Sequence, residues 1–574
     1  MEYDLKITGG RIVDGSGSPA YAGDVGVKDG RIVAVGRAEG QAAETIDAAG
    51  AVVSPGFIDC HTHYDAQVFW DPMLSPSVYH GVTTVLAGNC GFTLAPLSGR
   101  KEDAEYLLAM LSRVEGMPLA SLESAVKPDW TSFAGYLDKI DGTLAINTAF
   151  LVGHSALRRA VMGERAIQEK ASAEDLAKMQ DLLRQSLAAG GCGFSTTASP
   201  THSDHNGDPV PSRWADDEET IALAGTLRDY PGTWLELIPP YDPERPERRV
   251  ELPVAMSLAA QRPLNWNLIV VRSQQRELLD SQIALGHIAA ERGAKIHGLV
   301  PVTPIKSMVN FRTGQLLEML GGWHEFIHQP HEAKLAAMRD PAERRRLEHG
   351  MATQHANTGL PGEFDNFLIE HLPSETNAHW IGRHVHELAA AQGKNCLDAV
   401  FDLAIEEDLW LTISMPPLGA DEESWRLRGE VWRDEYTLIG ASDAGAHLDA
   451  INTFAITTQL LGEAVRERGL FTLEEGVRRI TSYLADRFGL KDRGRIEPGA
   501  IADLVVFDPA TIDCGPIAMR HDLPGGETRL YADSVGVHHV VVGGVPVARG
   551  NEPTGRLGGR VLRSGRDTQT VSLH

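Results

Sequence analysis

Two histidines separated by a single residue are the clearest chemical feature of the chain. His61 and His63 follow an apolar run, residues 51–58, that has the composition of a β-strand. Side chains at positions i and i+2 of a strand lie on the same face, so the two imidazoles point the same way. This arrangement is typical of two nitrogen ligands that converge on a metal ion such as zinc. The spacing alone also fits a pair of hydrogen-bonded histidines at a strand end.

Two further positions carry residue types that could complete such a centre. Cys90 stands in GNCGF (residues 88–92), where a thiolate could bind zinc and the glycines allow a tight turn. A lone cysteine is, however, often only a small core residue. Asp443 stands in IGASDAGAH (residues 439–447), where a carboxylate could bind a metal and act as a general base. The alternative for Asp443 is a turn residue beside glycine.

The elements that must position these residues alternate along the chain. Apolar β runs are separated by helical stretches, a pattern that predicts a parallel sheet. We place eight strands near residues 53–59, 83–87, 149–153, 193–196, 233–238, 264–271, 295–302 and 437–442. His61, Cys90 and Asp443 then follow the carboxyl ends of the first, second and eighth strands.

Both ends of the chain contain short β runs punctuated by glycine, including a hairpin signal at Asp29-Gly30. This pattern of short strands and glycines predicts one small β domain built from residues 1–52 and 491–574, with a central domain at residues 53–490 between them. The gap between the seventh and eighth strands is far longer than an ordinary βα connection. We therefore expect an insertion at residues 303–393, on the face that carries the candidate ligands, where it could act as a lid.

Histidines are frequent in this insertion, but their spacing matches no ligand motif. The pattern favours solvated helix faces for all five of them: His324, His328, His331, His349 and His355.

Composition narrows the class of protein. The 574 residues carry a formal net charge of −25, which argues against nucleic acids and anionic membrane surfaces as partners. The five cysteines are odd in number and widely scattered, so they do not form a disulfide framework. No apolar run approaches the length of a membrane helix, and the chain begins with no signal-like segment. We expect a cytoplasmic protein whose partner is a small molecule.

Several motifs together resemble the amidohydrolase superfamily. PGFIDCHTH (residues 55–63) closely resembles its first metal-binding strand, and GRIEPGAIADLVVFDP (residues 494–509) looks like the segment that completes its small β domain. GNCG, followed by LVGHSALR (residues 151–158), is similar to the N-acyl-D-amino-acid deacylase (D-aminoacylase) branch. The resemblance covers nearly the whole chain. It implies a (β/α)8 barrel with the metal at the carboxyl ends of the strands.

The resemblance implies the role of Cys90, and position at the strand ends suggests roles for other residues. Cys90 would be a metal ligand, and Asp443 would take a proton from the attacking water and deliver it to the leaving amine. His154, at the end of the third strand, would polarise or position the substrate carbonyl, unless it only caps the following helix. Arg158 could hold a substrate carboxylate. His297, on the seventh strand, is a candidate substrate group or a packed histidine.

The fifth and sixth strands depart from the family pattern. In the deacylase branch each ends in a metal-binding histidine, but residues 233–240 (TWLELIPP) and 264–271 (LNWNLIVV) contain none. Glu236 is an acceptable zinc ligand, whereas Asn265 or Asn267 would be a poor one.

This departure predicts one metal ion per chain, either zinc or another divalent metal. Its expected ligands are His61, His63 and Asp443, with Cys90 or Glu236 completing the shell.

The reaction implied by the resemblance is hydrolysis of the amide bond of an N-acyl-amino acid, with N-acyl-D-amino acids as the expected substrates, by metal-activated water. Two alternatives remain: the same machinery acting on a cyclic amide, an imide or a lactone, and a catalytically weak barrel that serves as a binding protein. The missing histidines motivate the second alternative.

Replacing His61 and His63 together with alanine tests the metal interpretation. The double variant should lose bound metal and activity, because both imidazoles are expected ligands, yet keep its far-UV circular dichroism, because ligands at strand ends are not core residues. Plasma mass spectrometry of dialysed protein gives the metal content. Full activity of the double variant would exclude the metal site.

Overall fold

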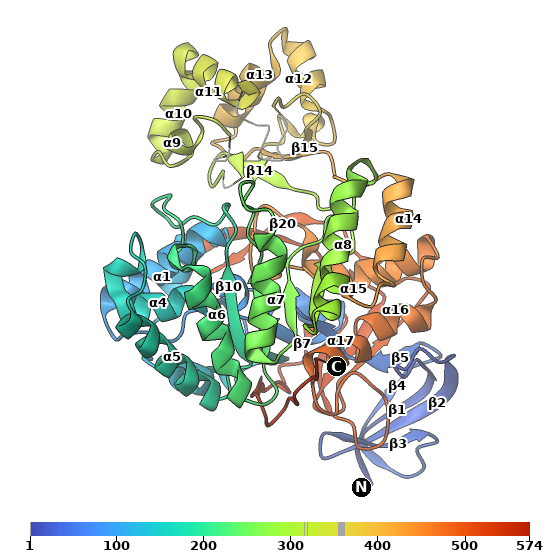
Figure 1. The fold of residues 1–574 in the computed structure, drawn as a ribbon. Coiled ribbons are helices and arrows are strands. Elements are labelled where there is room, and N and C mark those ends of the chain that lie inside the picture. The colour runs from blue at the N-terminus through green and yellow to red at the C-terminus, as the bar shows by residue number, and fades with distance from the viewer. Residues whose placement is uncertain (1, 315, 318–319, 354–361, 574) are drawn as a thin grey trace.

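The computed structural model describes residues 2–314, 316–317, 320–353 and 362–573. Figure 1 shows a central barrel of strands with helices around it, a β-rich part that contains the N-terminus, and a separate helical lobe above the barrel. The three parts correspond to the barrel, the small β domain and the insertion discussed below.

Eight parallel strands form the barrel within the described residues, which confirms the predicted fold. They are β6 (Phe57–Asp59), β7 (Val82–Ala87), β8 (Asn147–Phe150) continued by β9 (Val152–Gly153), β10 (Gly193–Thr197), β11 (Trp234–Ile238), β12 (Leu264–Trp266), β13 (Ile296–Val300) and β17 (Thr437–Ile439). Neighbours pair in parallel from β6 to β8 and from β9 to β17. A parallel bridge between Thr62 and Ala444 joins the first and last strands just beyond their ends.

Helices cover the outside of the barrel (Figure 1). They are α1 (Lys101–Val114), α2 (Leu119–Ala125), α3 (Phe133–Ile140), α4 (His154–Met162), α5 (Ala173–Ala188), α6 (Asp217–Gly225), α7 (Arg248–Ala260), α8 (Arg276–Glu291), α14 (Glu422–Val431), α15 (Ile456–Gln459), α16 (Leu473–Arg479) and α17 (Ser482–Phe488). Local sequence fixes several of their starts. In α5, for example, Ser172 and Asp175 form a reciprocal capping box, which satisfies two backbone N–H groups of the first turn.

The first barrel strand is shorter than predicted. Strand β5 (Val52–Pro55) pairs with strands of the small β domain, and the chain enters the barrel only at Phe57. Gly56 makes the crossing, because a Cβ there would meet the Thr83 side chain at 2.1 Å. The sequence showed no break because the residues on both sides of Gly56 are buried.

The small β domain combines both ends of the chain in one nine-stranded sheet. Its members are β1 (Tyr3–Ile12), β2 (Tyr21–Lys28), β3 (Arg31–Gly36), β4 (Ala42–Asp47), β5, β18 (Leu504–Phe507), β23 (Val537–Val542), β24 (Val545–Arg549) and β25 (Glu552–Pro553). Not all of the C-terminal segment lies in this sheet. Strand β26 (Val561–Leu562) pairs with β8, so the last residues return to the barrel.

Two short hairpin-like pairs complete the C-terminal segment. They are β19 (Asp513–Cys514) with β22 (Ser534–Val535), and β20 (Ala518–Leu523) with β21 (Glu527–Tyr531).

The insertion is a lobe with its own core. Strands β14 (Met308–Asn310), β15 (Leu368–His371) and β16 (Thr412–Ser414) form its sheet, and its helices are α9 (His324–Ile327), α10 (His331–Arg339), α11 (Pro341–Thr353), α12 (Val385–Gln392) and α13 (Cys396–Glu406). Its buried apolar side chains, from Val309 to Met415, form a cluster separate from the barrel core. The lobe therefore runs beyond the predicted end at Gly393. That glycine ends α12 in the left-handed region, and the chain continues into α13, which packs in the same core.

Most of the histidines in the lobe are at its surface. His324, His328 and His349 are exposed and His331 is partly buried, while His355 lies outside the described residues.

The lobe docks on the loop that follows strand β17. The N–H of Met308 donates to Ala450 O at 2.7 Å, and Asp449 Oδ2 accepts from Asn310 Nδ2 at 2.8 Å and from Thr313 Oγ1 at 2.6 Å. Because Asp443 stands between the strand and this loop, the lobe rests on the carboxyl-end face of the barrel.

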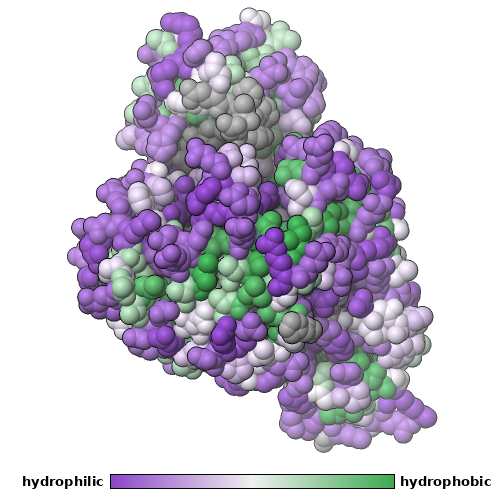
Figure 2. Space-filling view, viewed as in Figure 1, coloured by the Kyte–Doolittle hydropathy of each residue, from purple (hydrophilic) through white to green (hydrophobic). Residues whose placement is uncertain are grey.

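The face seen in Figure 2 is largely hydrophilic, with hydrophobic side chains gathered mainly in its middle. Among the described residues, no helix combines the length and the apolar composition that a membrane span needs.

Replacing Asp449 with alanine should loosen the docked lobe. The change removes the acceptor of two hydrogen bonds, so we expect amide hydrogen exchange at residues 308–314 to become roughly tenfold faster. Hydrogen-exchange mass spectrometry measures it. Asp408→Ala, which removes the acceptor of His331 inside the lobe, is the matched control and should leave these amides unchanged. Unaltered exchange in Asp449→Ala would show that other contacts hold the lobe.

Candidate metal centre

Four side chains meet at the carboxyl end of the barrel. His61 Nε2 lies 3.6 Å from Cys90 Sγ and 3.1 Å from Asp443 Oδ1. His63 Nε2 lies 3.9 Å from Cys90 Sγ and 3.7 Å from Asp443 Oδ1. The ligand atoms of His61, His63 and Cys90 all lie within 4.8 Å of one another. The structure thus brings together four of the residues that the sequence predicts as ligands.

Backbone pairing on both sides fixes the two histidines. The Thr62 N–H donates to Leu86 O at 3.0 Å, and the His63 N–H donates to Ala444 O at 2.8 Å. Ser442 Oγ donates to His61 O at 2.9 Å. The segment is therefore held between the second and eighth strands, and the side chains of His61 and His63 share one direction.

Cys90 is presented by a tight turn with a left-handed conformation, φ 58° at the cysteine itself. Gly88 has φ 79°, and a Cβ there would lie 2.6 Å from Leu151 O, so only glycine fits. Ser195 Oγ accepts from the Gly91 N–H and donates to Gly88 O, which clamps both ends of the turn.

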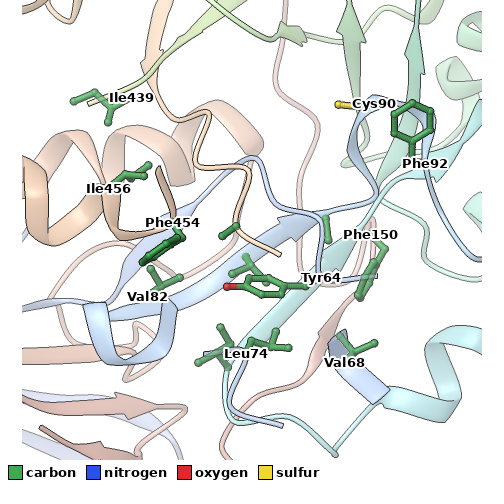
Figure 3. Close-up of a cluster of buried hydrophobic side chains, with 14 of the residues drawn as sticks. Tyr64, Val68, Leu74, Val82, Cys90, Phe92, Phe150, Ile439, Phe454 and Ile456 are labelled. Atoms are coloured by element: carbon green, nitrogen blue, oxygen red, sulfur yellow. The ribbon is translucent and has the colours of Figure 1, made fainter. Parts of the chain in front are cut away.

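An apolar cluster lies beneath these loops. Figure 3 shows Cys90 next to Phe92, with Tyr64 and Phe150 among the buried side chains of the same cluster. Such packing lets the turn resist displacement, because moving it would open voids in the cluster.

Asp443 lies in a strained segment. It has φ 49°, and Ala441 and His447 also have positive φ, a conformation that costs a non-glycine residue on the order of 1 kcal/mol or more. Burial alone would raise the pKa of Asp443, but the neighbouring imidazoles of His61 and His63 override it and hold this pKa well below its usual range. The carboxylate is therefore ionised at neutral pH.

Glu236 and Asn267 occupy the positions on the fifth and sixth strands where the sequence lacks histidines. Glu236 Oε2 accepts from the Cys90 N–H at 2.7 Å, and Asn267 Nδ2 lies 3.4 Å from His61 Nε2. Glu236 thus contacts the backbone of Cys90 and is outside the three-residue ligand group. Its other oxygen, Oε1, and Asn267 Oδ1 are buried without a hydrogen-bond partner among the described residues.

The donor set fits a zinc ion. Two imidazole nitrogens, a thiol and a carboxylate are the ligand types that zinc prefers. Burial, with Glu236 and Glu115 nearby, raises the pKa of the Cys90 thiol well above its ordinary value, and burial does the same for the Glu236 carboxyl. A cation bound at the imidazoles would favour the ionised form of both groups. The unsatisfied oxygen of Glu236 points to the same conclusion, because buried polar atoms normally have partners.

His154 and Arg158 are not brought to this group. Both ring nitrogens of His154 are occupied, Nδ1 by Thr196 Oγ1 and Nε2 by Glu219 Oε1, each at 2.9 Å. The Arg158 guanidinium, fully buried, donates to both carboxylate oxygens of Glu219. The predicted substrate contacts of these two residues are therefore not supported, since their polar atoms form an internal network. The sequence did not reveal Glu219 as their shared partner.

His297 lies at the opposite end of the barrel. It is the second residue of β13 and pairs in register with Asn265, whereas the carboxyl end of that strand is Val300. It lines a small cavity with Trp234 and Phe488, and burial lowers the pKa of its imidazole to about 3. Of the two readings left open by the sequence, its position favours a packed histidine.

Glu115 is a residue of this site that sequence reasoning missed. It is the C-cap of α1, 2% exposed, with Oε1 3.3 Å from His63 Nδ1. Burial, opposed by His63, raises the pKa of its carboxyl to about 7. A signal existed in the sequence: an acidic residue at the end of a helix runs against the helix dipole, so it needs a special partner.

Replacing Glu236 with glutamine should weaken metal binding by roughly tenfold, because it removes an anionic group beside the ligand cluster without changing volume. The metal-free variant should unfold at the same or a higher temperature, since a neutral amide is easier to bury than a carboxylate. Chelator competition and thermal unfolding measure the two quantities. Glu251→Gln, an exposed position on α7, is the matched control. If metal affinity is unchanged, the charge of Glu236 plays no part in the site.

Known proteins resemble this chain over nearly its full length. It is 29% identical to D-aminoacylase of Alcaligenes xylosoxydans xylosoxydans over 98% of this chain and 97% of the relative. It also superposes on a solved D-aminoacylase structure, described as having a binuclear metal centre with one-metal activation and second-metal attenuation (TM-score 0.65, 27% identity, 98% and 100% coverage). A third match is N-acyl-D-glutamate deacylase from Bordetella bronchiseptica, complexed with zinc and a phosphonate that mimics the tetrahedral intermediate (TM-score 0.63, 26% identity, 98% and 100% coverage). Residues 44–548 match the model of the Amidohydrolase family, and the chain belongs to that family.

Proposed function

We propose that this chain is a zinc-dependent hydrolase that cleaves the amide bond of N-acyl-D-amino acids. The observation that supports it most is the convergence of His61, His63, Cys90 and Asp443 at the carboxyl end of the barrel. The full-length similarity to D-aminoacylase and to N-acyl-D-glutamate deacylase supports the substrate class.

The two imidazoles and Asp443 would hold the ion, with the Cys90 sulfur as the further ligand. A bound zinc ion would supply Lewis-acid chemistry, polarising a substrate carbonyl and making water more acidic. The protein contributes fixed positions: the histidines are pinned by backbone pairing and the cysteine by its clamped turn. A site held this rigidly needs little reorganisation during reaction.

Asp443 is the proton carrier of the proposed reaction. Its Oδ1 lies 3.1 Å from His61 Nε2 and 3.7 Å from His63 Nε2, beside the place that a bound ion and its water would take, so the carboxylate could accept a proton from that water. The same carboxyl group can then donate that proton to the amine that leaves. Burial of the surrounding side chains excludes bulk water, which strengthens the electrostatic interactions inside the site.

The fifth and sixth strands support a single metal ion. A second ion would have to use Cys90, Glu236 and the Asn267 amide, and an amide oxygen adds little affinity for zinc. Glu236 also holds the Cys90 N–H with one of its oxygens. The ligand set therefore favours one tightly bound ion per chain.

Metal analysis combined with a substrate panel tests the proposal. Dialysed protein should retain about one zinc per chain and hydrolyse N-acetyl-D-amino acids in preference to their L forms, with activity lost on chelation and restored by zinc. Two tightly held ions would overturn the one-metal site. Hydrolysis confined to cyclic imides or lactones would overturn the substrate class. If the protein is metal-free and its ligand affinity is unaffected by chelation, the proposal that the chain is an enzyme is overturned.

A further inference from the structure

Glu115 joins three parts of the barrel's carboxyl end. It follows α1, which lies in the connection after the second strand. Its side chain reaches His63 of the first strand, with Oε1 3.3 Å from Nδ1. Its backbone oxygen accepts from the N–H of His447, in the loop after the eighth strand, at 2.5 Å, and its Oε2 lies 4.0 Å from His447 Nε2.

The position of Glu115 destabilises an ionised carboxylate. Glu115 is 2% exposed, so it has lost nearly all of its hydration. It also stands at the C-terminus of α1, where the helix dipole disfavours negative charge. A glutamate that served only to end the helix would be more stable at the surface. Its burial therefore indicates a specific partner, and the two imidazoles are the groups that it faces.

His63 requires a hydrogen-bond acceptor at its Nδ1. Its Nε2 faces the cluster of Cys90 and Asp443, so a metal would use that nitrogen. The ring proton then belongs on Nδ1, which is buried and makes no well-formed hydrogen bond among the described residues. The Glu115 carboxylate, 3.3 Å away, is placed to accept a hydrogen bond from that N–H. Such carboxylate–histidine pairs fix the tautomer and raise the basicity of a metal ligand.

We propose that Glu115 is a positioning residue for the metal centre: it accepts a hydrogen bond from the Nδ1–H of His63, so that Nε2 presents its lone pair, and it ties this ligand to the loop of His447. The inference rests on the proposed function, since it concerns the same zinc site. Glu115 lies outside the ligand group and would act on a bound ion through His63.

Glu115→Gln tests the proposal. The amide preserves the shape but is a weaker acceptor, so zinc affinity measured by chelator competition should fall about 10- to 100-fold. The absorption spectrum of the cobalt-substituted protein should also change, because it reports ligand geometry. Thermal unfolding of the metal-free protein should be unchanged or shifted upward, since a buried carboxylate has been replaced by a neutral group. Glu115→Asp keeps the charge and should retain more affinity than Glu115→Gln.

Glu105→Gln, an exposed position on the same helix, is the matched control and should behave as the wild type. The proposal is overturned if Glu115→Gln binds zinc as tightly as the wild type with the same cobalt spectrum. It is also overturned if the metal-free variant alone is destabilised, because Glu115 would then be structural. Failure of the wild type to bind zinc would instead overturn the proposed function, so the two failures are distinguishable.

Discussion

The burial of ionisable groups beside two imidazoles is the constraint on which this site depends. Glu236, Glu115 and Cys90 are almost entirely buried, and burial is the main cause that raises the pKa of each. Their charged forms are stable only beside a cation or strong hydrogen-bond donors. A divalent ion at the imidazole nitrogens would meet that requirement for several of them at once. The same burial that disfavours these anions in the metal-free chain would strengthen their attraction to a bound cation.

Hydrogen bonds to the backbone hold the ligand loops in place. The Cys90 turn is held by Ser195 at both ends and by Glu236 at the cysteine N–H, and Asp65 Oδ2 accepts from the Gly88 N–H. Displacing this turn would break several hydrogen bonds to side chains of the surrounding barrel. Positive φ angles at Cys90 and Asp443 show that the fold tolerates backbone strain at the two ligand loops.

Much of this arrangement could be predicted from the sequence because it depends on local patterns. The apolar runs located all eight barrel strands, and the short motifs located His61, His63, Cys90 and Asp443. What could not be predicted depends on contacts between distant segments. The partner of His154 and Arg158 is Glu219, more than 60 residues along the chain, and no local pattern links them. The crossing at Gly56 was hidden for a different reason: both flanking strands are buried, so the hydrophobic pattern does not change there.

The fifth strand carries Glu236 where relatives in the deacylase branch carry a histidine. The two carboxylate oxygens of Glu236 have different surroundings. One oxygen is committed to the Cys90 N–H, so the carboxylate cannot swing toward a distant ion without releasing the turn that presents the sulfur. The other oxygen is buried without a partner, which leaves it suited to a cation close to Cys90. A second ion farther along the fifth and sixth strands would meet the neutral amide of Asn267, which is a poor zinc ligand. The geometry of Glu236 thus supports the proposed single ion close to the Cys90 sulfur, with Asp443 as the proposed proton carrier.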